Sequence, residues 1–320
     1  MKKSLATIIL ASFIVAGFSQ VTDAAESLKT QTADSTDGWK RGGTISISLS
    51  QVSLTNWAAG GQNSMSSNGL ISLFAHYKKG NNILENYLDI GYGTLKQGKD
   101  EDWWKTDDKI DFTSKYGKKA ISNWYYAGLL NFKTQMTNGY NYPDHSTAIS
   151  GLMAPGYLLG AIGMDYKPND NFTAFIAPIT SKMTFVTNQT LADAGAFGVE
   201  PAVIDIPTGN IITSGQNIRS EFGGYMRFFY KKDIMENIGF QTKLDLFSNY
   251  LENPLNIDIS WEVLISMKVN KYISATISTH LLYDDDIDIA IDTNNDGITD
   301  KVGPRTQFKE VLGVGFSYKF

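Results

Sequence analysis

The sequence has no cysteine among its 320 residues, which excludes disulfide bridges, thiolate zinc sites and lipid attachment at a cysteine. Past its N-terminal segment it also has no hydrophobic run that approaches the ~20 residues of a membrane-spanning helix, so a helical membrane protein is excluded. Lys and Arg form no dense cluster, and the formal net charge is −5. Because nucleic-acid-binding proteins present a basic surface, no nucleic acid is expected as a partner.

The N-terminal segment has the pattern of a secretory signal peptide. Two lysines supply the charged start, and an apolar core follows over residues 5–18. A membrane anchor is the alternative, but that core is too short to span a bilayer. Cleavage is expected after Ser19 or as late as Ala24. A signal peptide is predicted over 1–19. Residues 20–41 are small and polar, and we predict that they form a disordered periplasmic lead-in. A barrel is predicted over the remaining residues, 42–320.

The last stretch of the chain alternates with a period of two. One parity is apolar except for Glu310 and carries Phe308, Leu312, Val314, Phe316, Tyr318 and Phe320. Such a period predicts a β-strand with one apolar and one polar face, and this strand is longer than the usual ~5–6 residues. It resembles the closing strand of bacterial outer-membrane barrels, in which a terminal Phe helps the barrel assembly machinery to recognise the chain.

Alternation recurs along the whole chain after Trp39, and the composition is rich in aromatic residues, with 17 Phe, 16 Tyr and 6 Trp. Twelve segments are predicted as strands: Thr44–Leu54, Asn68–Lys78, Ile83–Leu95, Lys109–Tyr116, Asn123–Lys133, Tyr157–Lys167, Phe172–Val186, Ser220–Tyr230, Ile238–Phe247, Ile257–Val269, Ile273–Tyr283 and Phe308–Phe320.

The connections alternate between short turns and longer loops. Short turns are predicted at Lys79–Asn82, Gly117–Lys119, Pro168–Asn171, Lys231–Asn237 and Asn270–Tyr272. An even strand number with this asymmetry is typical of bacterial outer-membrane barrels. We therefore expect an all-β fold: a transmembrane antiparallel β-barrel of about 12 strands, with short periplasmic turns and long outer loops. A soluble sandwich is the alternative, and strand length and loop asymmetry count against it.

Three stretches resemble one known family. They are TNWAAGGQNS (Thr55–Ser64), PGYLLGAIGMDYKP (Pro155–Pro168) and GPRTQFKEVLGVGFSYKF (Gly303–Phe320). Together they are similar to the domain-of-unknown-function 3078 family of Gram-negative outer-membrane proteins. The resemblance covers nearly the whole mature chain and implies a barrel in the cell outer membrane. It implies no activity.

The polar parity of the later strands predicts a charged lumen. Its expected members have mixed signs, which in a closed space pair with one another. They are Glu221, Arg227, Lys243, Asp245, Asp258, Glu262, Lys268 and His280.

The segment DTNNDGITD has the spacing of a calcium loop. Oxygen-bearing residues at Asp292, Asn294, Asp296 and Asp300, with Gly297 for the bend, fit the first part of such a loop. It lacks the Glu and the flanking helices of an EF-hand and resembles thrombospondin-type loops. The alternative is an Asn/Asp/Gly-rich turn without metal. Calcium is the one cofactor that the sequence suggests.

Signals for catalysis are poor, so we expect no enzyme. The run Pro143–Ser146 contains an Asp, a His and a Ser, but adjacent side chains rarely converge. Trp103 and Trp104 are expected to anchor the membrane interface, with a sugar- or peptide-stacking platform as the alternative.

Two functions remain open at this stage. One is a narrow channel or small-solute transporter. The other is a non-conducting barrel that stabilises the envelope or docks an envelope protein partner through the long loop 187–218. An outer-membrane lipid enzyme is a third, weaker hypothesis. The partners common to all three are outer-membrane lipid and the barrel assembly machinery.

Overall fold

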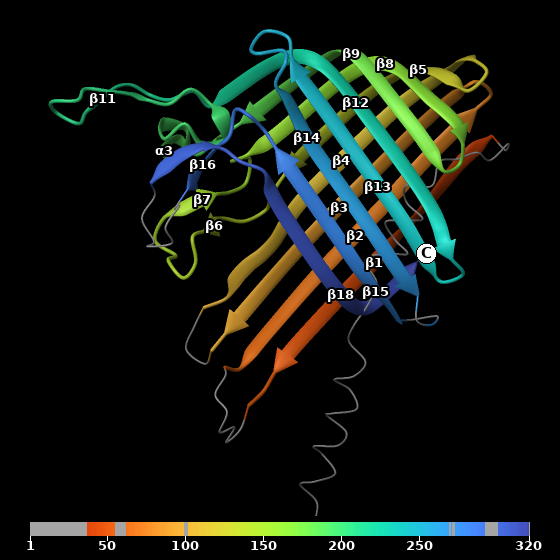
Figure 1. Cartoon of the computed structure of the whole chain (residues 1–320), viewed down its shortest axis with the longest axis horizontal. Helices are drawn as coiled ribbons and strands as arrows, with labels where there is room; N and C mark the ends of the chain where they lie inside the picture. Colours follow the sequence, from red (N-terminus) through yellow and green to blue (C-terminus); the bar gives the residue numbers. More distant parts are fainter. Residues whose placement is uncertain are drawn as a thin grey trace, which may run out of the picture.

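Twelve strands close into one antiparallel barrel (Figure 1). The computed structural model describes residues 37–54, 62–98, 102–268, 270, 273–291 and 300–319. The barrel and its strand number confirm the predicted fold class. The predicted signal peptide lies outside the described residues. The predicted lead-in is too long at its end, because residues 38–41 already belong to the first strand.

The barrel strands follow one another around the ring with only neighbouring hairpin connections. In chain order they are β1 (Gly38–Val52), β2 (Ser64–Lys79), β3 (Asn82–Gln97), β4 (Trp104–Ile121), β5 (Trp124–Thr134), β8 (Gly156–Asn169), β9 (Phe172–Phe185), β12 (Ile218–Met235), β13 (Ile238–Asn249), β14 (Ile257–Lys268), β15 (Ile273–Tyr283) and β18 (Gln307–Lys319).

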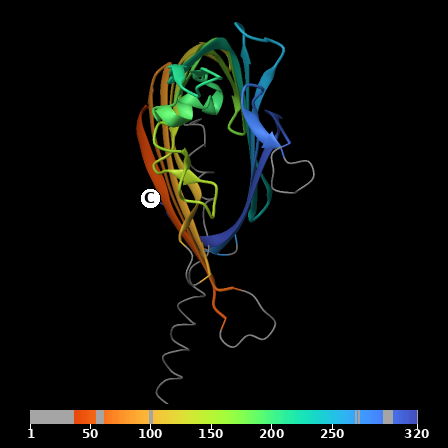
Figure 2. The same cartoon turned by 90° about the vertical axis from the view of Figure 1, so that its left-hand side faces the viewer.

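Smaller elements lie in the long connections, all at one end of the barrel. They are β6 (Gly139–Tyr140), β7 (Ala148–Ser150), α3 (Gln189–Asp193), the 3-10 turn η1 (Ala196–Gly198), β10 (Val203–Ile204), β11 (Ile211–Thr213), β16 (Asp288–Ile291) and β17 (Lys301–Pro304). We call this end the loop end and the opposite one the turn end. No helix in the described part of the chain is long and apolar enough to cross a membrane. Seen end-on, α3 and the β6–β7 hairpin lie across part of the mouth (Figure 2).

Two predicted turns are wrong in their bounds. The turn predicted at Lys231–Asn237 is shorter, because residues 231–235 still belong to β12. Residues Gly117–Lys119 lie inside β4, and the turn falls at Ser122 and Asn123, where Ser122 has a φ of 50°. Two lysines and a glycine do not end a strand here, because both faces of a strand reach water at the rim of a barrel. The left-handed backbone of Ser122, rather than charge, marks the reversal.

Alternation separates the two faces of the barrel wall as predicted. On β1, Ile45, Ile47 and Leu49 are exposed on the outside, whereas Ser46 between them is buried inside. Phe308, Leu312 and Val314 of β18 are likewise exposed. Because side chains of a strand point alternately to its two faces, the apolar parity forms a continuous outer surface.

A bulge on β9 changes its parity at Pro178. Ile176 pairs with Met164 of β8, and Ile179 pairs with Ile162, so β9 carries an extra residue opposite Gly163. Proline has no N–H to donate, and a bulge is a place where a strand tolerates it. A Cβ on Gly163 would stand 2.5 Å from Ala177 Cα, so only glycine fits opposite the bulge.

The ring closes between its first and last strands over a short stretch. Residues Thr44–Ile47 of β1 pair with Phe316–Lys319 of β18, whereas β1 pairs with β2 over its entire length. Among the residues that the structure describes, the closing seam is therefore the shortest strand pairing of the barrel.

Candidate functional site

The lumen is divided between two kinds of wall. Strands β3, β4, β5, β8, β9, β12 and β13 form what we call the packed wall, whose inward side chains are mostly large or charged. Strands β14, β15, β18, β1 and β2 form the closing wall. Its inward positions are richer in small residues, and those described include Ser46, Ser48, Ser66, Ser72, Ser260, Ser266, Thr276, Ser278 and Gly315.

An apolar cluster fills part of the lumen against the packed wall. Phe175 of β9, Tyr225 of β12 and Phe247 of β13 pack there with four smaller side chains, Ala127, Leu129, Ala161 and Ala177. Three networks of charged residues lie along this wall, one at mid-height and one toward each end.

The central network contains four of the predicted lumen residues. The Arg227 guanidinium donates to Asp245 through Nε at 2.6 Å and through Nη2 at 2.9 Å, and the Tyr225 hydroxyl donates to the same carboxylate at 2.9 Å. Lys243 Nζ lies 2.5 Å from Glu262 Oε1. A bidentate arginine–carboxylate pair fixes both partners in one orientation, so these side chains brace the packed wall.

The turn-end network was missed by the sequence analysis. Lys115 Nζ lies 2.8 Å from Asp165 Oδ2 and 3.3 Å from Glu85 Oε2, and Lys167 Nζ lies 2.9 Å from Glu85 and 3.4 Å from Asp165. These four charges alternate in a closed ring, and Glu85 and Asp165 are buried. The parity rule that identified Asp245 also places these residues inside, but applying it needs the register of β3, β4 and β8.

The loop-end network joins predicted and unpredicted residues. Lys182 Nζ of β9 lies 2.7 Å from Asp258, 3.4 Å from Asp284 and 3.5 Å from Glu221. Arg219 pairs with Glu221 at 3.4 Å and with Asp286. Four carboxylates thus face two cations at this end of the lumen.

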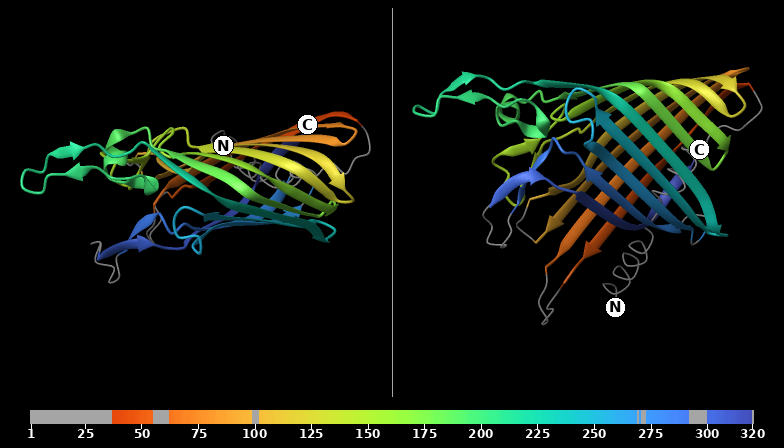
Figure 3. Two further views of the ribbon diagram at one scale, coloured as in Figure 1. Left: turned by 90° about the horizontal axis from the view of Figure 1, so that it is seen from above. Right: turned by 45° about the horizontal axis from the view of Figure 1, so that its top comes forward.

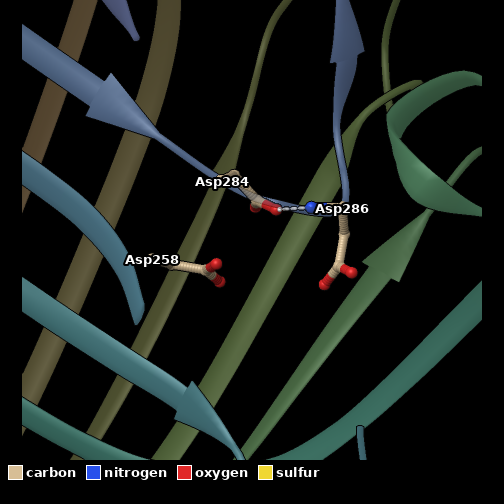
Figure 4. A group of neighbouring side chains, drawn as sticks. All are labelled: Asp258, Asp284 and Asp286. Atoms are coloured by element: carbon tan, nitrogen blue, oxygen red, sulfur yellow. Dashed lines mark hydrogen bonds between the residues drawn. The ribbon is translucent and has the colours of Figure 1, made fainter. Parts of the chain in front are cut away.

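Three of these carboxylates come close enough together to suggest a metal site. Oxygens of Asp258, Asp284 and Asp286 lie within 4.8 Å of one another, and the Asp286 amide donates to Asp284 at 3.0 Å (Figure 4). However, Lys182 and Arg219 already stand against these oxygens. The two side-chain cations supply the positive charge that a metal ion would bring, so the arrangement fits an ion-pair network better than a metal centre.

The two remaining predicted lumen residues lie in different surroundings. His280 Nε2 lies 3.0 Å from Ser260 Oγ on the closing wall. Lys268 is exposed at the turn end, where its backbone N–H donates to the Asn237 carbonyl. Strand parity is correct for Lys268, but β14 ends there and the side chain is not enclosed.

The space left in the lumen beside the central network is small. A cavity of about 90 Å³ lies between side chains of β3, β4, β5, β9, β12 and β13, and its lining includes Asp111, Lys115 and Arg227. At ~30 Å³ per molecule it has room for about three waters. It offers little space to a solute.

The predicted calcium loop cannot be placed. Asp292, Asn294 and Asp296 lie outside the described residues, and Asp300 is exposed just before β17. Strands β16 and β17, which flank this sequence, pair as an antiparallel hairpin. The neighbouring Asp284 and Asp286 belong to the loop-end network, and Asp285 accepts a hydrogen bond from the Tyr283 hydroxyl at 2.9 Å.

The Asp–His–Ser run in the β6–β7 loop does not form a triad. Asp144 accepts a hydrogen bond from the Ser146 N–H at 2.7 Å, and hydrogen bonding to Ser146 lowers the pKa of the Asp144 carboxyl. The His145 ring packs instead against Tyr140 and Tyr142, with centroid separations of 5.6 and 5.0 Å. The loop geometry therefore holds His145 in an aromatic cluster.

Comparison with known proteins gives a family match over part of the chain and no activity. Residues 49–140 match the family model described as a protein of unknown function, DUF3078. This match confirms the family resemblance over residues 49–140, which are less than half of the chain. Among curated proteins nothing matches.

Two solved structures are similar over most of the chain. The translocator domain of the autotransporter NalP from Neisseria meningitidis has a TM-score of 0.35 at 9% identity and covers 98% of this chain and 97% of its own. An outer membrane channel from Pseudomonas putida F1 has a TM-score of 0.40 at 11% identity and covers 89% of this chain and 97% of its own. At such scores the fold rests on the strand pairing and not on these likenesses.

Proposed function

We propose that this chain is an outer-membrane barrel with a lumen that is closed at rest, and that it docks a protein partner through the β10–β11 hairpin. The observation that supports a membrane location is the face pattern of the wall. Apolar side chains are exposed on the outside of the ring, including Ile47 at 58%, Tyr126 at 63% and Ile162 at 64%. In water such a surface would be costly, whereas in a bilayer it meets hydrocarbon.

The closed lumen follows from the packed wall. Buried ion pairs at both ends and at mid-height, together with the apolar cluster, fill much of the lumen beside the packed wall around the cavity of about 90 Å³. A permanent water-filled pore needs a wider lumen, as in barrels with more strands. The geometry therefore favours docking over conduction.

The hairpin presents apolar side chains away from the barrel. Ile206 is 94% exposed and Ile212 is 67% exposed, and Val203, Ile204 and Ile211 are each more than half exposed. Figures 1 and 3 show the hairpin reaching beyond the loop end. Two backbone hydrogen bonds close its tip: the Gly209 N–H donates to the Asp205 carbonyl at 2.7 Å, and the Asp205 N–H donates to the Asn210 carbonyl at 2.8 Å.

The base of the hairpin is held by a second apolar core. Leu191 and Ala192 of α3 pack with Ala154, Val186 and Val199. The Gly215 N–H and the Gln189 side chain both donate to Asp193 Oδ1, at 2.8 and 2.7 Å. A firm base with an exposed apolar tip is the arrangement expected of a contact surface.

The occupant we infer is a protein that adds an extended strand. An isolated two-stranded hairpin is only marginally stable in water, and both of its edges carry unpaired backbone groups. Lipid cannot satisfy those groups, whereas a strand from another chain can. The aliphatic side chains would then be covered by the same partner.

Site-specific crosslinking tests the docking proposal. A photoreactive residue at Ile206 in intact cells should give one discrete adduct, and the double variant Ile211→Asp/Ile212→Asp should abolish it. A photoreactive residue at Val302 on β17, which is 62% exposed, serves as the matched control and should not give that adduct. An identical adduct from Val302, or one that survives the double variant, would refute docking at the hairpin.

A narrow channel is the second candidate, and the closing wall favours it. The small hydroxyl-bearing side chains of the closing wall would leave room for a narrow file of water molecules beside the packed wall. Planar-bilayer recording separates the two functions. A docking barrel with a closed lumen should show no stable open conductance level. For a channel, Ser278→Trp should reduce the conductance, whereas Thr279→Trp, on the outer face of the same strand, should not.

A further inference from the structure

A second cavity, of about 330 Å³, lies at the loop-end rim beside β3 and β4. Tyr92 and Thr94 of β3, with Trp103 and Lys105 at the start of β4, line one side of it. The β5–β8 connection supplies the other side with the polar residues Thr137 and Asn138 and with aromatic rings. The volume is at the lower end of the ~300–1,000 Å³ typical of small-ligand pockets.

The aromatic rings that line the β5–β8 side of this rim pocket are held by one another and by Trp104, which lies behind Tyr142. The Trp104 and Tyr142 rings stack with centroids 5.6 Å apart and planes inclined by 11°, and the Tyr142 hydroxyl accepts a hydrogen bond from the Lys105 N–H at 2.8 Å. Tyr140 and His145 pack against Tyr142. Such ring stacking keeps the aromatic faces in fixed orientations.

The buried carboxylate of Asp108 holds the loop against the barrel. It accepts hydrogen bonds from the Met136 N–H, the Thr137 N–H and the Thr137 hydroxyl, each at 2.8 Å, and from Lys105 Nζ at 3.0 Å. Lys105 Nζ also donates to the Thr137 carbonyl at 2.8 Å. These contacts form the pocket in advance and leave the Lys105 charge compensated by Asp108.

We propose that this rim pocket binds a neutral pyranose unit of a saccharide. One face of a pyranose ring is lined by C–H bonds and suits an aromatic surface, and Trp103, at 46% exposed, and Tyr92, at 40%, offer such surfaces at the opening. The hydroxyls at the ring edge suit the amide of Asn138 and the hydroxyls of Thr94 and Thr137. An acidic ligand is disfavoured because the lysine that lines the pocket is already paired.

The contrast with the turn end distinguishes a pocket from a simple interface anchor. There, Trp124 and Tyr166 also pair, at 4.8 Å between centroids, but they line neither of the two cavities described. Aromatic residues at both rims can anchor a barrel in a bilayer. Only the loop-end group combines a cavity, amide and hydroxyl groups and a loop fixed by a buried carboxylate. This proposal is independent of the docking at the β10–β11 hairpin.

Saturation-transfer NMR and calorimetry on the full barrel test the proposal. The protein is held in zwitterionic micelles, since alkyl glycoside detergents would compete, and titrated with methyl pyranosides of glucose, galactose and mannose at millimolar concentrations. Trp103→Ala should weaken binding about tenfold, the loss expected for one aromatic contact. Trp103→Phe should retain most of the binding, and heat-modifiability on gels checks that each variant is folded.

The matched control is Trp124→Ala at the turn end, which should bind the sugars like the wild type. No sugar signal in the wild type, or equal losses in the two alanine variants, would overturn the proposal. Two further arms distinguish the source of the sugar. Competition by vesicles containing lipopolysaccharide, but not by phospholipid vesicles, identifies a membrane glycolipid. Competition by soluble oligosaccharide alone identifies a free glycan.

Discussion

The packed wall and the closing wall share one outer surface and differ on the inside. Along the packed wall, inward charges reach over intervening strands: Lys167 of β8 contacts Glu85 of β3, although β5 and β4 lie between them. On the closing wall many inward side chains are too short to do so, and Ser260 bonds to His280 on the adjacent strand. The long-range contacts of this wall come from Asp258 and Lys309 near the loop end. Long inward side chains therefore fill the lumen beside the packed wall, whereas the short ones leave more open space beside the closing wall.

The largest expected effect tests whether the packed wall depends on its charges. Glu85→Ala would leave Lys115 and Lys167 short of a carboxylate in a buried place and should cost roughly 3–5 kcal/mol of unfolding free energy. Ser48→Ala on the closing wall should change it by less than ~0.5 kcal/mol. Urea unfolding in micelles measures both. Similar losses would remove the distinction between the walls.

The outer faces should respond alike in both walls. Val263→Arg on β14 and Leu130→Arg on β5 each place a charge in hydrocarbon and should each cost roughly 2–4 kcal/mol near mid-membrane. Ser260→Arg, on the inner face of β14, should cost less. The fraction of folded barrel on heat-modifiability gels is the measurement, and an equal loss for Ser260→Arg would contradict the assignment of faces.

The bulge on β9 should make the packed wall intolerant of added atoms at one glycine. Gly163→Ala would overlap the carbonyl oxygen of Ile176 and should cost roughly 1–3 kcal/mol. Gly160, on the same strand, has no atom within 4 Å of an added Cβ and supplies the control, Gly160→Ala. The measurement is the thermal unfolding midpoint of each variant in micelles. Equal midpoints would mean that the backbone at the bulge shifts to accommodate the added Cβ.

The smallest expected effect concerns the connection that leads into the last strand of the closing wall. If Asp292, Asn294, Asp296 and Asp300 bind calcium, ~1 mM of the ion against a ~0.1 mM site stabilises the bound form by about 1.4 kcal/mol. Calcium should then slow proteolysis of residues 284–305 in the wild type and not in Asp292→Ala/Asp296→Ala. Equal cleavage rates in all conditions would leave this sequence as a plain turn.

The sequence alone determined the barrel, because alternation is a local property. Each strand of a closed barrel has one outer face and one face toward the lumen, so Ile47 and Ser46 reveal their sides without knowledge of their neighbours in space. The same rule placed Arg227, Lys243 and Asp245 inside. It located the turn after β4 incorrectly, because a charged rim has no local signal that distinguishes strand from turn.

Only the tertiary structure decided which inward groups meet. Lys182 joins Asp258 and Asp284, and Lys115 joins Asp165, through the curvature and stagger of the ring rather than through spacing along the chain. The rim pocket likewise brings Tyr92, Trp103 and Tyr142 together from two strands and a loop. Sequence periodicity fixes the direction in which each side chain points, but the distance between two side chains depends on strand register and closure. Those are set by the pairing of all twelve strands at once.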